Sequence, residues 1–189
     1  SVDAALEYPW MELLVPGGAE WRFFRGRSEP SAGLEWTDFS FDDSKWEKGL
    51  SGFGHDHGRK RNRDMGTLLP DVHAEYTMLY TRHIFHIQDP AAFGRLRLVA
   101  YSDDGFVAYL NGTEIGRLNA GAPGTRVPFD GPPVGGSNGW LPVEIWAEAK
   151  ALRPGGNVLA VQGLNHKPGA FFLEPILEAE CVPDPVRPR

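Results

Sequence analysis

The sequence predicts an all-β protein, an antiparallel β-sandwich with about eight or nine strands and at most one short helix. Its 189 residues include 23 Gly and 16 Pro, which break helix interiors, and these residues show no three-residue period. The apolar runs are short and are bounded by turn residues. Between two such runs stands Asn111-Gly112, the strongest short signal for a β-hairpin.

The first half of the chain contains three candidate strands. Trp10 to Val15 is an apolar run that stops at Pro16-Gly17-Gly18, and a second short run covers Trp21 to Phe24. After a long polar segment, the stretch from Phe39 to Trp46 is typical of a turn anchored by aromatic side chains. Tyr76 to Ile87 is the strongest candidate, because it is the longest run rich in β-branched and aromatic residues.

The second half continues with strands and one long loop. Arg95 to Tyr101 alternates polar and apolar residues at its start, and the hairpin joins Phe106–Leu110 to Thr113–Leu118. A loop dense in Gly and Pro runs from Asn119 to Gly139. We expect a short strand and a helical turn within Val143–Leu152, followed by two last strands over Asn157–Leu164 and Ala170–Glu180.

Composition and charge exclude several classes of protein. The formal net charge of −6 argues against nucleic acid as the main partner, and the basic run Arg59–Arg63 lies in a predicted loop. No stretch of about 18 apolar residues predicts a membrane span. The single cysteine, Cys181, rules out an internal disulfide and a thiolate metal cluster. We expect one sandwich over residues 1–181 and a Pro-rich linker or tail over 182–189, in a chain excised from a longer protein.

Four segments carry a resemblance to a known fold family. They are Phe41–Gly49 with Gly52-Phe53-Gly54, Tyr80–Phe85, the run DDGFVAYLNGTEI at Asp103–Ile115, and Leu152–Asn165. Together they resemble the galactose-binding-domain-like jelly roll. The similarity extends to the sugar-binding domain of β-galactosidase-type glycosidases and to non-catalytic modules of large secreted bacterial proteins. The resemblance implies a jelly-roll sandwich in an extracellular or cell-surface protein, with a polysaccharide or oligosaccharide and neighbouring domains as partners.

Sugar recognition needs groups that hydrogen-bond to hydroxyls beside a flat apolar face. The candidate ligand-binding residues are polar or aromatic and lie at predicted strand ends and loops: Asp103, Asp104, Arg117, Asn119, Trp140, Asn165 and His166. Each also has a purely structural interpretation. Asp103-Asp104-Gly105 is equally typical of a turn stabilised by side-chain carboxylates, and Trp140 of a rim aromatic.

One structural calcium ion is the cofactor that the resemblance implies. Calcium takes six to eight oxygen ligands, and the candidate carboxylates are Asp42, Asp43, Asp56, Asp64 and Glu174. No EF-hand spacing supports them, and Asp42-Asp43-Ser44 also fits a turn that leads into a buried Trp46. His55 and His57 suggest a zinc site only if a third ligand comes from elsewhere.

Catalysis has little support in the sequence. Glu144 and Glu148 could share a helical face, but ordinary surface pairs do so too, and no nucleophile, base and orienting group stand in a known motif. We therefore expect a non-catalytic carbohydrate-binding module that targets a larger extracellular bacterial protein to a polysaccharide. The alternative is a structural or adhesive module that packs against neighbouring domains without binding sugar.

Overall fold

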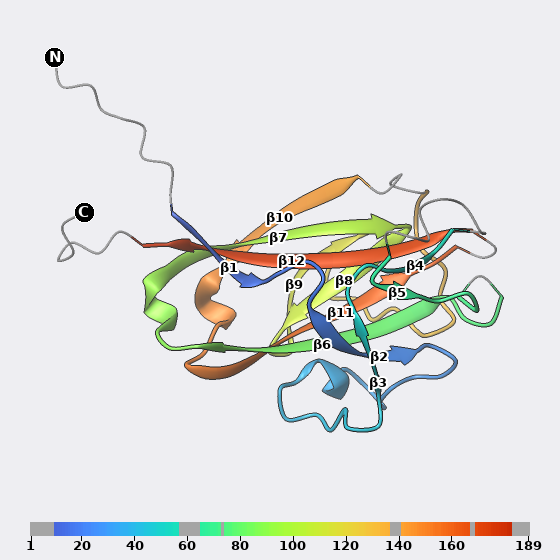
Figure 1. Ribbon diagram of the computed structural model, residues 1–189, viewed down its shortest axis with the longest axis horizontal. Coiled ribbons are helices and arrows are strands. Elements are labelled where there is room, and N and C mark those ends of the chain that lie inside the picture. Colours follow the sequence, from blue (N-terminus) through green and yellow to red (C-terminus); the bar gives the residue numbers. More distant parts are fainter. Residues whose placement is uncertain (1–9, 57–64, 73, 137–140, 167–168, 183–189) are drawn as a thin grey trace, which may run out of the picture.

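The computed structural model describes residues 10–56, 65–72, 74–136, 141–166 and 169–182, which form two β-sheets packed face to face (Figure 1). Every pair of neighbouring strands is antiparallel except β4 with β5. The helical segments in these residues are single 3-10 turns, η1 (Glu35–Thr37), η3 (Pro90–Ala92) and η4 (Ala149–Ala151). The prediction of an all-β antiparallel sandwich is therefore confirmed.

Each sheet has six strands. Sheet A has the order β10-β7-β12-β4-β5, and β1 also pairs with β12. Its strands are β10 (Pro142–Glu148), β7 (Phe93–Asp103), β12 (Phe171–Cys181), β4 (Phe53–His55), β5 (Thr67–Leu68) and β1 (Met11–Val15). Sheet B has the order β3-β2-β6-β11-β8-β9. Its strands are β3 (Glu47–Leu50), β2 (Glu20–Arg25), β6 (Met78–Ile87), β11 (Gly155–Leu164), β8 (Gly105–Leu110) and β9 (Thr113–Leu118).

The main core lies between the sheets and follows the alternation of the strands. In β7, Leu96, Leu98 and Ala100 are buried, whereas Arg95 and Arg97, which alternate with them, lie on the outer face. Complete burial of a large apolar side chain stabilises the folded state by about 1.5–3 kcal/mol. The outer face of sheet A is left open, with charged residues and the 43% exposed Trp146 of β10 on it.

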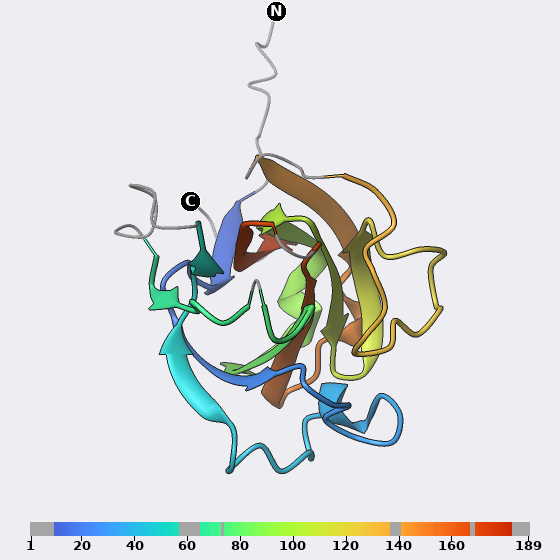
Figure 2. The ribbon, with the colours of Figure 1, turned by 90° about the vertical axis from the view of Figure 1, so that its right-hand side faces the viewer.

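A second apolar cluster covers the outer face of sheet B. The segment that joins β2 to β3 folds over this face (Figures 1 and 2). Its Trp36 packs against Tyr80 and Tyr109, and its Trp46 packs against Phe24 of β2. With both faces of sheet B covered, β11 is buried along nearly its whole length. The sequence predicts core packing for four tryptophans among the strand and turn anchors, Trp10, Trp21, Trp36 and Trp46. This is confirmed for Trp21, Trp36 and Trp46 and is wrong for Trp10, which is 79% exposed.

Arg82 of β6 holds the covering segment in place. Its side chain is fully buried, and its Nε donates to Asp43 Oδ2 at 2.7 Å. Its Nη1 donates to the carbonyl oxygens of Trp36 and Asp38, the latter at 2.8 Å. The guanidinium also lies 5.3 Å from the centre of the Phe41 ring. The buried cation is tolerated here because its guanidinium contacts a carboxylate, backbone carbonyl oxygens and an aromatic face.

The two ends of the sandwich differ in character. At one end β1 begins beside the last residues of β12, where the backbone N–H of Cys181 donates to the Trp10 carbonyl at 2.8 Å. At the other end lie the connections β7–β8, β9–β10 and β11–β12, together with the start of β6 (Figure 1, right). We call this second end the loop end.

The structure refines the expected list of elements. It has twelve strands rather than eight or nine, because β3, β4 and β5 have only four, three and two residues and show no period in the sequence. Glu144 and Glu148 lie on strand β10 rather than on a helix. The expected tail beyond residue 182 lies outside the described residues. Within the described residues, no helix has the length and apolarity needed to span a bilayer.

Candidate ligand-binding site

The loop end brings together five of the seven residues predicted to bind ligand. Asp103 ends β7 and Asp104 follows it, Asn119 follows β9, and Asn165 and His166 follow β11. Arg117 lies within β9, two residues before Asn119. Trp140 lies outside the described residues. The sequence therefore located a real spatial cluster, although its members come from three separate connections.

Asp104 is the centre of this cluster. Its Oδ2 accepts from the backbone N–H of His166 at 2.6 Å, and its carbonyl oxygen accepts from Asn119 Nδ2 at 2.8 Å. Its own N–H donates to the carbonyl of Leu164 at 3.1 Å. One residue thus ties the β7–β8 turn to the segments that follow β9 and β11. Asp103 and Asp104 are each only 6% exposed.

The electrostatics of Asp104 are unusual for a carboxylate. Burial raises the pKa of Asp104 to about 6, and the adjacent Asp103 carboxyl, which is hydrogen-bonded to it, adds to the effect. The hydrogen bond from His166 acts in the opposite direction and limits the rise in pKa. Near neutral pH the carboxylate is therefore held ionised at a cost to the fold.

Most of the other predicted ligand residues are engaged inside the protein. Asn119 Nδ2 also donates to the Gly136 carbonyl at 2.9 Å, and the fully buried Asn165 donates through Nδ2 to Val72 at 3.1 Å. Arg117 forms a bidentate pair with Glu114, with both N···O distances 2.7 Å. These side chains fix the loops in place. A direct contact between them and a ligand remains a prediction.

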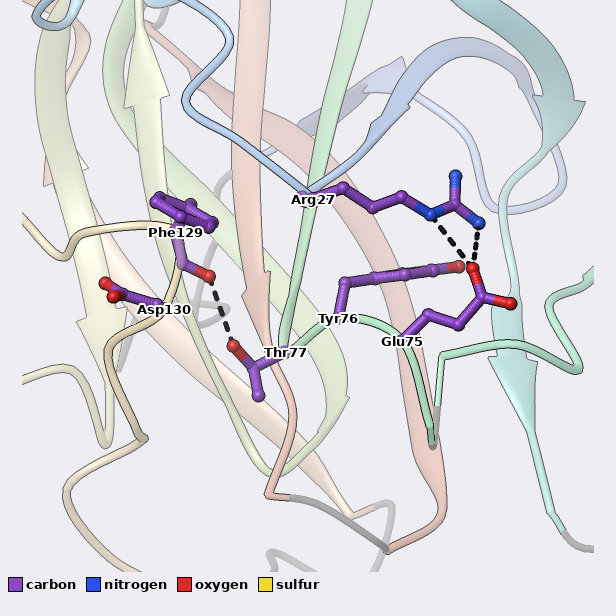
Figure 3. A pocket seen from close by; sticks show the side chains of 7 residues that line it. Arg27, Glu75, Tyr76, Thr77, Phe129 and Asp130 are labelled. Carbon is purple, nitrogen blue, oxygen red and sulfur yellow. Dashed lines mark hydrogen bonds and ion pairs between the residues drawn. The ribbon is translucent and has the colours of Figure 1, made fainter.

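Beside this cluster a pocket of about 360 Å³ opens at the surface (Figure 3). Three parts of the chain line it. Gly26 and Arg27 follow β2, residues 75–77 precede β6, and Phe129 and Asp130 belong to the β9–β10 connection. In Figure 3, Arg27, Glu75 and Tyr76 lie on one side, and Phe129 and Asp130 lie on the other. We call it the loop-end pocket.

One wall of the loop-end pocket is a stack of an arginine on a tyrosine. The Arg27 guanidinium lies 5.4 Å from the centre of the Tyr76 ring. Arg27 donates to Glu75 Oε2 from Nε at 3.0 Å, and from Nη2 to Asp71 Oδ2 at 2.8 Å. The Tyr76 hydroxyl donates to Asp71 Oδ1 at 3.0 Å, and burial together with Asp71 raises the pKa of Tyr76 above its ordinary value. The wall is ordered because Nε and Nη2 of Arg27, the Glu75 carboxylate and the Tyr76 hydroxyl are each held by a neighbour.

Hydrogen bonds connect the pocket to the predicted cluster behind it. The Thr77 hydroxyl donates to the Phe129 carbonyl at 3.1 Å, and the Thr77 carbonyl accepts from the N–H of Asn165 at 2.8 Å. Asn165 is next to His166, which Asp104 holds. The predicted cluster therefore supports the pocket from behind, and the pocket presents a different set of side chains to solvent.

Sequence reasoning missed the residues of the loop-end pocket itself. Tyr76 and Thr77 fell within the expected long strand, and Arg27 in a polar segment without a motif. The one available signal was Phe129-Asp130, an aromatic beside a carboxylate inside a loop otherwise rich in Gly and Pro. Such a pair in a loop is typical of a binding surface more than of a core.

A second pocket, of about 490 Å³, lies on the segment between β2 and β3. Its polar side chains mostly serve their own loop. Asp38 Oδ1 accepts from the N–H of Ser40 at 3.0 Å, Glu35 accepts from Gly33 at 2.7 Å, and Thr37 donates to Leu34 at 2.6 Å. The loop-end pocket is the better candidate site, because it keeps polar groups that the described residues do not engage.

The candidate calcium ligands do not gather at one point. Asp42 accepts from the N–H of Ser44, Asp43 is paired with Arg82, and Glu174 on sheet A accepts from the N–H of Gly18. Asp56 is buried after β4, and Asp64 lies outside the described residues. The part of the chain that the structure describes contains no group of three or more His, Cys, Asp or Glu arranged to hold a metal ion. The calcium ion remains a prediction, and the described carboxylates do not fit it as a set.

Of the two histidines considered for a zinc site, His57 also lies outside the described residues.

Solved structures provide the only similarity found. No protein-family model matches the chain, and no match is found among curated proteins. The fold is similar to a β-glucuronidase from an uncultured Clostridium species, with a TM-score of 0.52 and 16% identity over 93% of this chain. It is also similar to the Ruminococcus gnavus β-glucuronidase, with a TM-score of 0.53 and 14% identity over 92% of this chain. The Bacteroides uniformis β-glucuronidase gives a TM-score of 0.52 and 14% identity over 90%.

These similarities concern the fold. The chain spans only 30% of the Clostridium and Ruminococcus proteins and 18% of the Bacteroides protein. It thus corresponds to a part of those larger glycosidase chains.

Proposed function

We propose that this chain is a non-catalytic carbohydrate-binding module of a larger extracellular bacterial protein, and that it targets that protein to a polysaccharide. The sugar occupies the loop-end pocket. The observation that supports this best is the composition of the pocket, in which a stacked Arg27–Tyr76 wall lies on one side and Phe129 and Asp130 lie on the other.

The chemistry of the pocket suits a sugar. Sugars offer hydroxyl groups around their edge and C–H groups on their faces, so they need polar and flat apolar partners side by side. Arg27 Nη1 makes no hydrogen bond within the described residues, and Asp130 is exposed and makes none there with its side chain. These two groups supply a donor and an acceptor, and Phe129 supplies apolar surface. The pocket is open and wet, so we expect a modest affinity for a single site.

The position of the pocket also supports targeting. It lies at the end of the sandwich opposite to the paired residues Trp10 and Cys181, where the described chain begins and ends (Figure 1). A ligand at the loop end therefore does not collide with anything attached near those residues. Binding to a polymer would raise the local concentration of an attached enzyme on its substrate.

The carboxylates argue for a binding role rather than a catalytic one. Acid–base hydrolysis of a glycoside needs two carboxyl groups that flank an accessible bond. Among the described residues, the neighbouring carboxyls Asp103 and Asp104 are buried and join loops, and the carboxyls of Asp71 and Glu75 beside the pocket are both paired with Arg27. The similar fold in larger β-glucuronidases, of which this chain spans up to 30%, supports a module within a glycosidase-type protein.

A glycan and polysaccharide binding screen tests the proposal. We expect binding to one polysaccharide family, weakened at least about tenfold by Phe129→Ala and by Arg27→Ala. Arg27 is exposed, so its variant should fold even if Phe129→Ala perturbs the adjoining core. Trp146→Ala is the matched control, because this exposed aromatic lies on the outer face of sheet A. Loss of binding in the control alone would place the sugar on sheet A and refute the pocket.

A structural or adhesive module is the second candidate function. It is favoured by the internal use of most predicted ligand side chains and by exposed apolar groups on the outer face of sheet A, such as Leu13 and Trp146. In that case the folded protein would bind no sugar at millimolar concentration. A neighbouring domain of the parent protein would instead protect Trp146 from solvent, which tryptophan fluorescence of the two-domain protein would report.

A further inference from the structure

We infer that the loop-end pocket selects uncharged sugars and discriminates against uronic acids. This inference rests on the proposed function and adds the class of ligand. It follows from the charge of the pocket and of the groups directly behind it.

The cations of the pocket are already neutralised by carboxylates of the protein. Arg27 contacts Glu75 at 2.5 Å and Asp71 at 2.8 Å. The Asp71 carboxylate also contacts Arg25 at 2.5 Å, and Arg25 contacts Glu47 at 2.8 Å. Each guanidinium therefore lies between two carboxylates, and neither offers an unbalanced positive charge to an acidic ligand.

The Asp71 carboxylate at the centre of this network stays ionised near neutral pH. Burial alone would raise the pKa of Asp71, but the Tyr76 hydroxyl and Arg25 outweigh it and lower the pKa below its ordinary value. Conversely, the hydrogen bond to Glu75 contributes most to raising the pKa of Arg27. The ion pairs thus persist across the physiological range.

Asp130 adds a further negative charge on the opposite side of the pocket. It is exposed and has no ion pair within the described residues. Among the described residues of the pocket and of the ion-pair network behind it, two guanidinium groups stand against four carboxylates, which gives these groups a formal charge of −2. A uronate carboxylate would be repelled by Asp130 and would find no unpaired cation among these groups.

A neutral sugar meets no such penalty. Its hydroxyl groups can donate to Asp130 and accept from the Nη1 group of Arg27. Hydroxyl groups bind to an ionised partner through charge-assisted hydrogen bonds, which are stronger than neutral ones. The described residues of the pocket therefore have the groups that an uncharged glycan needs and include no unpaired cation for a uronate.

Matched pairs of oligosaccharides provide the test. Oligomers of galactose and galacturonic acid, and of glucose and glucuronic acid, differ in each pair by a hydroxymethyl group replaced by a carboxylate. With the full 189-residue chain at low salt, calorimetry should show binding of the neutral member at least about tenfold tighter than the acidic one. Raising the ionic strength should narrow the difference, because exposed charges are screened.

The variant Asp130→Asn separates charge from shape. It keeps an oxygen acceptor, and we expect it to strengthen uronate binding and reduce the neutral-to-acidic ratio to about threefold. Glu12→Gln removes the same charge from an exposed residue of β1 at the other end of the sandwich and should leave the ratio unchanged.

The outcomes distinguish the inference from the proposed function. If the acidic oligosaccharide binds as tightly as the neutral one, and Phe129→Ala abolishes this binding, the selectivity is overturned but the pocket remains the sugar site. An equal ratio in Asp130→Asn and the parent chain would also overturn it. If neither oligosaccharide binds, or if binding is unaffected by Phe129→Ala and Arg27→Ala, both the proposed function and the inference are refuted.

Discussion

Replacing Asp104 by asparagine should stabilise the protein at neutral pH and have little effect at acid pH. Asparagine keeps an oxygen that accepts from the N–H of His166, so the 2.6 Å hydrogen bond survives in a neutral form. What disappears is the cost of a buried ionised carboxylate beside Asp103.

The magnitude follows from the shift in pKa. A rise from 3.8 to about 6 corresponds to at most about 3 kcal/mol in the free energy of unfolding. Because the pKa is higher in the folded state, the folded protein takes up this proton first as the pH falls. The destabilising contribution of Asp104 therefore decreases as the pH falls from about 6 to about 4. Above pH 6 the ionised carboxylate lowers the free energy of unfolding.

Urea unfolding followed by tryptophan fluorescence at pH 7.5, 5.5 and 4 measures this dependence. We expect Asp104→Asn to be up to about 3 kcal/mol more stable than the parent at pH 7.5 and nearly equal to it at pH 4. Other titrating groups are common to both proteins and cancel in the difference. Asp130→Asn serves as the control, because that exposed side chain makes no hydrogen bond or ion pair within the described residues. A difference between Asp104→Asn and the parent that is the same at all three pH values, or a loss of stability at pH 7.5, would refute the reasoning.

Three further predictions concern stability. Arg82→Met should cost about 3–5 kcal/mol in urea unfolding, because it leaves the partly buried Asp43 carboxylate and two carbonyl oxygens without the hydrogen bonds from Arg82; a loss under about 1 kcal/mol would contradict the role of Arg82. Gly112→Ala should lower the free energy of unfolding by about 1 kcal/mol, because the residue has a φ of +84° in the β8–β9 turn. Gly136→Ala is the control, because a Cβ added there meets nothing within 4 Å. Thermal unfolding with calcium and with chelator tests the predicted ion: a rise of several degrees in the midpoint with calcium would show that an ion is bound, and an unchanged midpoint would refute it.

The strands that could be predicted are those whose periodicity is long enough to read. Tyr76–Ile87 contains β6, and the Asn111-Gly112 signal correctly placed the β8–β9 hairpin, with positive φ at both residues. By contrast, β5 has two residues and exists only because it lies beside β4. Pairing partners of that kind are tertiary information and leave no local pattern.

The candidate site shows the same division. Asp103, Asp104 and Asn165 stand at strand ends, so a sandwich brings them to the loop end whatever their precise partners are. Whether a carboxylate faces solvent or another loop depends on the connections around it, and here Asp104 and Asn119 face inward. Arg27 and Tyr76 could not be predicted as neighbours, since their contact depends on how the segment after β2 crosses the start of β6.

The pairing of β1 with β12 has a consequence for engineering. Neighbouring strands lie about 4.8 Å apart, so the described chain enters and leaves the sandwich through two adjacent backbones, Met11 opposite Glu180. A surface loop of an unrelated host could accept such a domain with little distortion, because closing the gap between the two junctions costs almost no chain entropy. The eleven residues of β12 then hold the loop end about 35 Å from the junctions. The sandwich would act as a rigid spacer in such a graft, with its recognition surface held clear of the host.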